Sequence, residues 1–388
     1  MDRSQRFDAA ALKREITDLA LRLGASDVRV TGASESPETL DAMRDAFSRG
    51  DMQTWGYAES YARKAAQPST LLENARSVIC VALPYRTQRP AIAPLQGRVS
   101  NYAWSPDYHR RMQAMLREIA AFIDERAGAS VTAVACDTKP LAERAFAARA
   151  GLGWVGKHTN LITPGAGSFV FLGEIVTSIG LEDDAALKKT CGACTRCIPA
   201  CPTGALRGNY TIDATRCISV LTQRTDAIPR ELRPLIGTWV WGCDICQEVC
   251  PPNSRARVEA AQTNAPHAHA AAAPDLVKLL HLRSGEFKRT YQPTAMGWRG
   301  AAVLRRNAAV ALGNALDRST VPALAASLES DPHPLVRGHA AWALGRIGSP
   351  AAIRTLRERS SFEEDASVRA EILAALERFG TSVPLEVQ

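Results

Sequence analysis

The segment from Cys191 to Cys250 constrains this chain more than any other part of its sequence. Eight of the ten cysteines lie in it. It begins Cys191-Gly-Ala-Cys194-Thr-Arg-Cys197-Ile-Pro-Ala-Cys201-Pro202 and ends Cys243-Asp-Ile-Cys246-Gln-Glu-Val-Cys250-Pro251. The first run has the C-x2-C-x2-C-x3-C-P spacing that holds [4Fe–4S] clusters in bacterial ferredoxins. The sequence therefore predicts a ferredoxin-like domain with two [4Fe–4S] clusters.

The same pattern suggests how the ligands are shared. In two-cluster ferredoxins, the cysteine before the proline binds the other cluster. One cluster is then held by Cys191, Cys194, Cys197 and Cys250, and the second by Cys201, Cys217, Cys243 and Cys246. Cys217 is assigned because no third cysteine stands close behind Cys246 that is not already used. Zinc is the alternative for a C-x2-C pair, but two zinc sites do not explain the three-cysteine run or the prolines.

Length and charge set wider limits. A chain of 388 residues suggests two or three domains. Its formal net charge of +7 permits a polyanionic partner without requiring one. Its apolar runs are broken by charge before the roughly 20 residues that a membrane-spanning helix needs. Residues 1–14 are charged and lack the apolar core of a signal peptide. We therefore expect a cytoplasmic protein without a membrane partner.

Residues 1–180 are predicted to form a mixed α/β domain. Helical periodicity runs over residues 7–23 and 108–126, and short β-rich runs cover residues 28–30, 78–83 and 131–136. Helices between strands indicate an α/β layer architecture. Cys80 and Cys136 lie within the apolar strand-like runs, so both are predicted to be buried core thiols.

Two loops of this domain are candidates for chemistry. Asp137 follows the last predicted strand, and open α/β sheets bind ligands at strand ends. An equally weighted alternative is that Asp137 caps a turn or the helix that follows. The second loop carries Gly151, Gly153 and Gly156, which would let backbone approach a bulky ligand closely. A probable strand follows it, unlike the dinucleotide fingerprint, and a hairpin is the simpler interpretation.

Residues 181–255 form the predicted cluster domain, and residues 256–388 are predicted to be helical after a linker between Asn253 and Pro274. Arg305-Arg-Asn-Ala-Ala-Val-Ala-Leu-Gly313 recurs around Arg337 and, more faintly, around Arg369, which indicates HEAT-like repeats. Before the repeats, basic residues from Lys278 to Arg306 alternate with aromatic residues that include Phe287 and Tyr291. This pattern suits an RNA loop, and a solvated helix face is the alternative.

Taken together, the motifs resemble those of the epoxyqueuosine reductase family. They are Asp137-Thr-x-Pro-Leu-x-Glu-Arg, Gly151-Leu-Gly-Trp-x-Gly-Lys, the ferredoxin run, Arg216-Cys-Ile-Ser219-x-Leu-Thr222-Gln223, the Cys243 to Cys250 motif, and Gly297-Trp-Arg-Gly with the HEAT-like repeats. The resemblance runs in the same order from about Arg63 to Gly348. A series of motifs in one order is far more specific than any one of them.

The resemblance implies a cobalamin-dependent iron–sulfur oxidoreductase that acts on tRNA. Such an enzyme reduces epoxyqueuosine at the wobble position to queuosine, the last step of queuosine biosynthesis. Electrons would pass from an external low-potential donor through the clusters to cobalamin, and Asp137 would donate a proton. A carboxyl group shielded beside a corrin would have a raised pKa. We expect a monomer. The alternative is a corrinoid iron–sulfur reductase of a small molecule, similar to a dehalogenase.

The resemblance also implies contact residues. Those for cobalamin are Arg63, Ser100, Asp137, His158, Thr159, Asn160, Ser168, Ser219, Thr222 and Asp244, and those for tRNA are Gln223, Trp298, Arg299, Arg305 and Arg306. Asp107-Tyr-His109 begins like the D-x-H-x-x-G cobalamin motif, but Met112 stands where the glycine would be. We therefore expect base-off cobalamin without a protein imidazole ligand.

Overall fold

The structure is a computed structural model that describes residues 8–256 and 272–379. It divides into two compact units that interleave along the chain. Among the described residues, the first unit comprises 8–88, 107–215 and 244–256, and the second comprises 89–106, 216–243 and 272–379. The division into 1–180, 181–255 and 256–388 follows sequence motifs and stays a prediction. Most of the predicted linker lies outside the described residues.

The first unit is built on a four-stranded sheet in the order β1-β2-β7-β4. Its strands are β1 (Asp27–Gly32), β2 (Ser77–Pro84), β4 (Thr132–Ala135) and β7 (Val170–Thr177). All three pairings are antiparallel. The rule that places ligands at strand ends was drawn from parallel sheets, so it gives Asp137 no support here. The case for Asp137 rests on its contacts instead.

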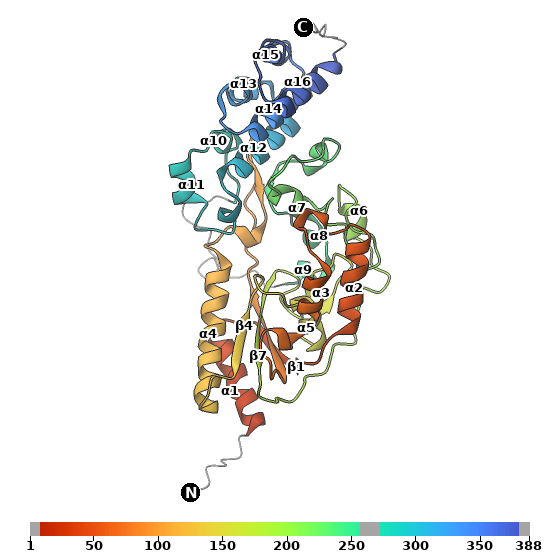
Figure 1. Ribbon diagram of the computed structural model, residues 1–388, viewed down its shortest axis with the longest axis vertical. Helices are drawn as coiled ribbons and strands as arrows, with labels where there is room; N and C mark the ends of the chain where they lie inside the picture. The colour runs from red at the N-terminus through yellow and green to blue at the C-terminus, as the bar shows by residue number, and fades with distance from the viewer. Residues whose placement is uncertain (1–7, 257–271, 380–388) are drawn as a thin grey trace. The chain divides into compact units, whose positions relative to one another are not determined.

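Helices cover both faces of this sheet (Figure 1). On one face, α1 (Ala9–Arg22) contacts β1, and α4 (Tyr108–Ala127) contacts β4 and β7. On the other, α5 (Glu143–Arg149) contacts β1, β2 and β7. Strand β2 is buried along its whole length, because Val78, Cys80 and Ala82 belong to the core that includes α5. The predicted helices and strands are therefore present, and Cys80 and Cys136 are buried as expected.

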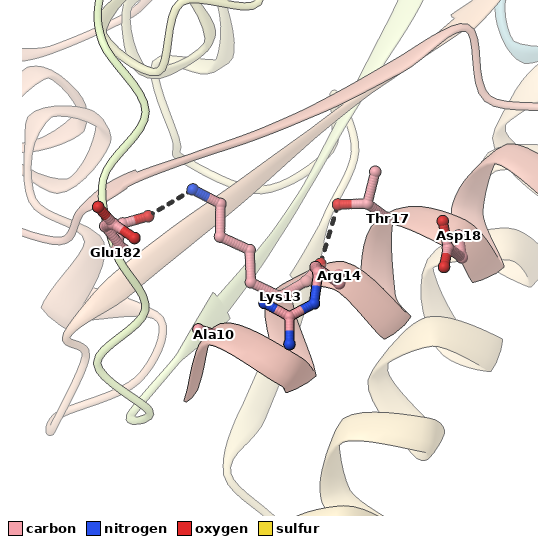
Figure 2. Close-up of a pocket in the computed structure, with 6 residues that line it drawn as sticks. All are labelled: Ala10, Lys13, Arg14, Thr17, Asp18 and Glu182. Atoms are coloured by element: carbon pink, nitrogen blue, oxygen red, sulfur yellow. Dashed lines mark hydrogen bonds between the residues drawn. The ribbon is translucent and has the colours of Figure 1, made fainter. Parts of the chain in front are cut away.

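A surface hollow beside α1 shows how this helix is anchored (Figure 2). Ala10, Arg14 and Asp18 contribute to its lining, and Lys13 crosses it. The Lys13 ammonium donates to the Glu182 carbonyl at 2.8 Å and pairs with the Asp184 carboxylate at 2.8 Å. These bonds fasten α1 to the segment before the cysteines, and we assign the hollow a structural role. No helix in the described residues is long and apolar enough to cross a bilayer.

The second unit combines a short parallel strand pair with a stack of helices. Strand β3 (Arg98–Val99) pairs with β8 (Trp239–Trp241). The later helices are α10 (Leu276–Leu280), α11 (Ser284–Thr290), α12 (Ala301–Ala315), α13 (Val321–Ser330), α14 (Pro334–Ile347), α15 (Pro350–Ser360) and α16 (Ala366–Glu377). Helix α14 contacts α12 and α16, and α13 and α15 contact each other and α14. This stacking is the HEAT-like array that the sequence predicted.

The repeat also places equivalent ion pairs along the array. Arg305 binds the Asp331 carboxylate through Nε at 2.7 Å and Nη2 at 3.1 Å. One repeat later, Arg337 binds the Glu363 carboxylate through Nε at 3.1 Å and Nη2 at 2.8 Å. Such bidentate pairs fix the geometry of neighbouring turns. Arg305 thus stabilises the repeat, and its role as a tRNA contact stays a prediction.

Arg306 likewise belongs to the interior. Its side chain is 0% exposed, and its guanidinium donates to the Asn307 side chain and to the carbonyls of Asp226, Leu221 and Thr222. Burial lowers the pKa of Arg306 to about 9, so the group stays charged at neutral pH. A residue so enclosed cannot reach RNA, and the prediction for Arg306 is wrong. Phe287 and Tyr291 also pack into the core of this unit.

Replacing Arg306 with Ala is expected to lower the free energy of unfolding by about 2–4 kcal/mol, because buried carbonyls lose a charged donor. Thermal unfolding followed by circular dichroism would measure the effect. Arg354→Ala is the matched control, since Arg354 is exposed on α15 and its side chain makes no hydrogen bond or ion pair with the described residues. Equal melting temperatures for the two variants would contradict the structural role of Arg306.

Candidate functional site

The first unit brings together the four cysteines predicted for the first cluster. Cys191, Cys194 and Cys197 lie on one loop, which ends in α6 (Cys197–Ala200), and Cys250 precedes α9 (Pro251–Ser254). Cys191 and Cys250 pack with the buried Trp154. Burial, and then the neighbouring thiols of Cys191, Cys197 and Cys194, raise the pKa of Cys250 to about 11. Iron binding would displace the thiol protons.

The surroundings of these sulfurs fit a cluster. The Lys157 backbone N–H donates to the Cys191 Sγ at 3.4 Å, and the Lys157 ammonium donates to the Gly192 carbonyl at 2.9 Å. Hydrogen bonds to cluster sulfurs tune the reduction potential. Over residues 8–256 and 272–379, no three His, Cys, Asp or Glu side chains converge on a single metal ion. Four cysteine thiolates with an N–H donor at Cys191 Sγ fit the ligand set of a [4Fe–4S] cluster.

The second set of predicted cysteines is divided between the units. Cys201 and Cys246 belong to the first unit, where Cys201 follows α6 and Cys246 lies in α8 (Ile245–Glu248). These two helices contact each other. Cys217, before α7 (Ile218–Gln223), and Cys243 belong to the second unit. Their assignment to a second cluster stays a prediction.

Asp137 lies just after β4 with a left-handed backbone, at a φ of 55°. Its side chain is 63% exposed. Its Oδ2 accepts hydrogen bonds from the Tyr108 hydroxyl at 3.0 Å and from His109 Nε2 at 3.2 Å. Its backbone N–H donates to the Glu143 carboxylate. The N-cap of α5 is Ala142, so the alternative in which Asp137 caps that helix is wrong.

The charges of this site form a chain of carboxylate, imidazole and carboxylate. His109 Nδ1 also binds the Asp107 carboxylate, at 2.7 Å. Burial lowers the pKa of His109, but the hydrogen bonds to Asp107 and Asp137 outweigh it and raise this pKa to about 9. The hydrogen bond from His109, opposed by burial, lowers the pKa of Asp137. A protonated His109 imidazole would stabilise the Asp137 charge, and the raised pKa expected for a carboxyl group shielded beside a corrin stays a prediction.

Sequence patterns do not predict these partners of Asp137. Tyr108 and His109 belong to an incomplete cobalamin motif in the sequence, and Glu143 belongs to the loop that contains Asp137. The Tyr108 ring stacks on Phe171 at 4.1 Å and on His109 at 4.1 Å, which holds both side chains in place. Both ring nitrogens of His109 face carboxylates. Base-off cobalamin without a protein imidazole ligand stays a prediction.

The glycine-rich loop forms the hairpin that the simpler interpretation predicted. Strands β5 (Trp154–Val155) and β6 (Leu161–Ile162) pair antiparallel. A Cβ on Gly153 would lie 2.5 Å from the Ile162 carbonyl oxygen, so only glycine fits there. The backbone at Gly153 thus closely approaches the partner strand β6.

His158, between these strands, has an unusual environment. It is 2% exposed, and its Nδ1 accepts the Asn160 backbone N–H at 3.2 Å. Burial lowers its pKa to about 4, so the imidazole is neutral and carries its proton on Nε2. This Nε2 has no hydrogen-bond partner among the described residues. A buried unpaired donor is costly, and a bound group that accepts its proton would remove the cost.

The other predicted cobalamin contacts are mostly buried or bonded. In the first unit, Ser168 bonds to Gln247 and Asn253, and exposed Arg63 pairs with Glu59 at 3.1 Å. Thr159 has a left-handed backbone, and its carbonyl accepts from Arg144. Asp244 is fully buried. In the second unit, Thr222 bonds to Gly242 and Ser219, and Ser100 is buried. Their assignment as cobalamin contacts stays a prediction.

The remaining predicted tRNA contacts lie in the second unit. Trp298 is 58% exposed, and the guanidinium carbon of Arg299 lies 3.5 Å from its ring centroid. Gln223 donates to the Ser219 carbonyl at 2.9 Å. Four basic side chains on or beside α10 and α11 are exposed, namely Lys278, Arg283, Lys288 and Arg289. We call these four residues and Trp298 the basic surface.

Three family models match the chain. One, described as "Epoxyqueuosine reductase QueG, DUF1730", matches residues 66–138, which end just after the first residue of the Asp137 loop. A second, "4Fe-4S double cluster binding domain", matches residues 190–253, a range that contains all eight predicted ligands. The third, "HEAT repeats", matches residues 300–377. Their order along the chain is the order of the sequence motifs.

Similarity to known proteins extends over almost the whole chain. The epoxyqueuosine reductase of Bacillus anthracis is 36% identical over 384 residues, covering 96% of this chain and 98% of that protein. The Escherichia coli (strain K12) protein of that name is 36% identical, covering 88% and 91%. A crystal structure of epoxyqueuosine reductase with an epoxyqueuosine-modified tRNA-Tyr stem loop has a TM-score of 0.90 at 33% identity, covering 96% of this chain and 100% of that one.

An α/β unit, a double-cluster domain and HEAT repeats in one chain define an iron–sulfur oxidoreductase. The sequence identity to epoxyqueuosine reductases exceeds 30% over nearly the full length of this chain, which narrows this class of protein to one family. The chain belongs to the epoxyqueuosine reductase family.

Proposed function

We propose that this chain reduces epoxyqueuosine at the wobble position of tRNA to queuosine. Removing the epoxide oxygen as water takes two electrons and two protons and leaves an alkene. The observation that carries the proposal is the Asp137 carboxylate, held by His109 and Tyr108 in a chain of this family. We propose further that the chain works as a cytoplasmic monomer with an external low-potential electron donor.

Two [4Fe–4S] clusters and base-off cobalamin are the proposed cofactors. The eight cysteine thiolates would hold clusters that supply electrons one at a time. Bound cobalamin would supply a reductant strong enough for an epoxide. Its proposed contacts are Arg63, Ser100, Asp137, His158, Thr159, Asn160, Ser168, Ser219, Thr222 and Asp244. The unpaired Nε2 donor of His158 supports the presence of a bound group, because it needs an acceptor.

Side chains of the protein would deliver the protons that the reaction needs. Opening the epoxide leaves an oxide-like oxygen that must be protonated, and Asp137 is the proposed donor to it. At neutral pH the proton resides on His109, whose Nε2 lies 3.2 Å from the Asp137 Oδ2. We therefore propose that His109 reloads Asp137, while Asp107 holds the imidazole in position.

A related structure supports a catalytic role for the loop that carries Asp137. The Bacillus subtilis epoxyqueuosine reductase has been described with an aspartate catalytic loop swung out of its active site, and it matches this chain with a TM-score of 0.88 at 32% identity. In this chain, 63% of the Asp137 side chain is exposed. A substrate could therefore reach its carboxylate.

The protonation of His109 predicts how rate depends on pH. The pKa is raised from 6.5 to about 9, so the protonated pair is complete at neutral pH and is lost as pH rises through about 9. We expect kcat/KM to fall about tenfold per pH unit above that value. Initial rates with modified tRNA between about pH 7 and pH 10 would test it. A flat profile for the native chain, or one that His109→Gln leaves unaltered, would remove His109 from proton delivery.

The basic surface, which includes Trp298, is the proposed tRNA contact, together with Arg299 and Gln223. Its exposed cations can bind phosphates, and the exposed Trp298 ring can stack on an unpaired base. Changing Lys288 and Arg289 to Ala should weaken tRNA binding and reduce the salt slope by about 2. Filter binding over a salt series would measure this. Arg14 and Arg22, exposed on α1, are the matched control pair, and equal slopes for both variants would count against this surface.

A further inference from the structure

A second patch of positive charge surrounds the cysteine loop of the first cluster. Residues 185–212 contain no Asp or Glu and carry Lys188, Lys189, Arg196 and Arg207. Of these, Arg207 is neutralised, because it bonds to Asp51 at 2.5 Å and to Asp213 at 3.5 Å. The other three are exposed. Neither Lys188 nor Arg196 has an ion-pair partner among the described residues.

These cations lie close to the proposed cluster ligands. Arg196 directly precedes Cys197, and the ammonium of Lys157 bonds to the carbonyl next to Cys191. The Lys189 ammonium lies 4.7 Å from the centroid of the Trp154 ring, which packs against Cys191 and Cys250. Helix α8, which contacts α6, adds one acidic residue, Glu248. The net charge around this loop is therefore positive.

The proposed ligands of the first cluster differ in their exposure to solvent. Cys194 is exposed, whereas Cys197 and Cys250 are buried. An electron carrier must bring its redox group close to the cluster, and the exposed edge at Cys194 is open to it. Interfaces of electron-transfer partners are small and weak, and charge complementarity supplies much of their association rate.

We infer that Lys157, Lys188, Lys189 and Arg196 form a docking surface for a small, acidic, one-electron carrier protein that reduces the first cluster. The inference rests on the cluster assignment of the proposed function, but not on the tRNA substrate. In each encounter the carrier is oxidised by one electron and the cluster is reduced by one. With a flavin carrier, the anionic hydroquinone becomes the neutral semiquinone, so no proton moves and no covalent bond forms.

RNA is the competing occupant of a basic patch, and two observations disfavour it. Single-stranded RNA binding uses exposed aromatic rings as stacking platforms, but Trp154, the ring that Lys189 covers, is 7% exposed, which leaves Tyr210, 39% exposed, as the exposed ring of this segment. A phosphate backbone on this loop would also cover Cys194, the exposed edge through which electrons enter. An acidic carrier protein satisfies both the charge and the redox role.

The test uses the full-length, cluster-loaded protein and reduced flavodoxin as the acidic carrier, with dithionite as a small reductant that needs no docking. Stopped-flow absorbance would follow cluster reduction at several salt concentrations. Lys188→Glu with Arg196→Glu should lower the rate constant with flavodoxin at least tenfold at low salt and abolish its fall with added salt. Reduction by dithionite should stay unchanged. Equilibrium binding of oxidised flavodoxin should weaken in parallel.

The matched control is Arg354→Glu with Arg357→Glu, which makes the same change of charge on exposed residues of α15. Flavodoxin and dithionite should both reduce the clusters of this control variant at the native rate. If the double Lys188, Arg196 variant loses iron, the neutral pair Lys188→Gln and Arg196→Gln replaces it, with a fall of about threefold or more expected. If flavodoxin reduces the clusters of these variants at the native rate, the inference is overturned. It is also overturned if the variants lose only their affinity for tRNA. Failure to reduce the native clusters even with dithionite would instead count against the cluster assignment.

Discussion

Asp137→Asn is expected to lower turnover of epoxyqueuosine tRNA by about 10²- to 10⁴-fold, the range typical of a lost general acid. The amide keeps the size of the side chain and can still accept from Tyr108 and His109 through its oxygen. It cannot take a proton from the imidazole and pass it on. Single-turnover assays under anaerobic conditions, with product measured by mass spectrometry, would give the rate.

Controls separate this loss from a loss of structure. The variant should keep native iron content and native affinity for tRNA, because Asp137 lies on a loop and does not cap α5. Thr138→Ala, at the next exposed position of the loop, is the matched variant and should retain native rates within a few-fold. Turnover by Asp137→Asn close to that of the native chain would show that another group supplies the proton.

Cys197→Ala is expected to lower iron from about eight atoms per chain to about four and to reduce turnover to background, because the first cluster loses a buried ligand. Electrons would then have no path from the protein surface into the site. Iron analysis of anaerobically purified protein, with electron paramagnetic resonance after reduction, would count the clusters.

Cys80→Ala is the matched control for the loss of a cysteine. Cys80 is 0% exposed in the core of the sheet, far along the chain from the ligand motifs, and burial raises its pKa well above the ordinary value. This variant should keep all of the iron, although it removes a buried thiol. Native iron content in Cys197→Ala, or a zinc signal in place of iron, would contradict the cluster assignment.

The features that could be predicted from the sequence are those that depend on the spacing of residues close together in the chain. The cysteine motif, the 32-residue recurrence from Arg305 to Arg337 and the strand-like runs each depend on neighbours within one or two elements. The double-cluster and HEAT models match where these patterns lie. Antiparallel pairing of the sheet was not visible, because strands β2 and β7 are far apart in the chain.

Charge patterns were the least reliable guide, because they do not show which residues are buried. Arg305 and Arg306 look alike in a basic stretch, but Arg305 pairs with Asp331 and Arg306 bonds to carbonyls 80 to 85 positions earlier. His109 reaches Asp137 across a separation of 28 residues, because α4 packs against β4. Contacts of this kind depend on tertiary packing, which a single sequence does not record.

The most direct test of the account is an anaerobic assay of the native chain with cobalamin, a strong reductant and tRNA from cells blocked at epoxyqueuosine. The account predicts that nucleosides from the treated tRNA lose one oxygen and become queuosine, that omission of cobalamin stops the reaction, and that the free epoxyqueuosine nucleoside reacts far more slowly. Unchanged epoxyqueuosine in tRNA, with both clusters present and reduced, would contradict the proposed function.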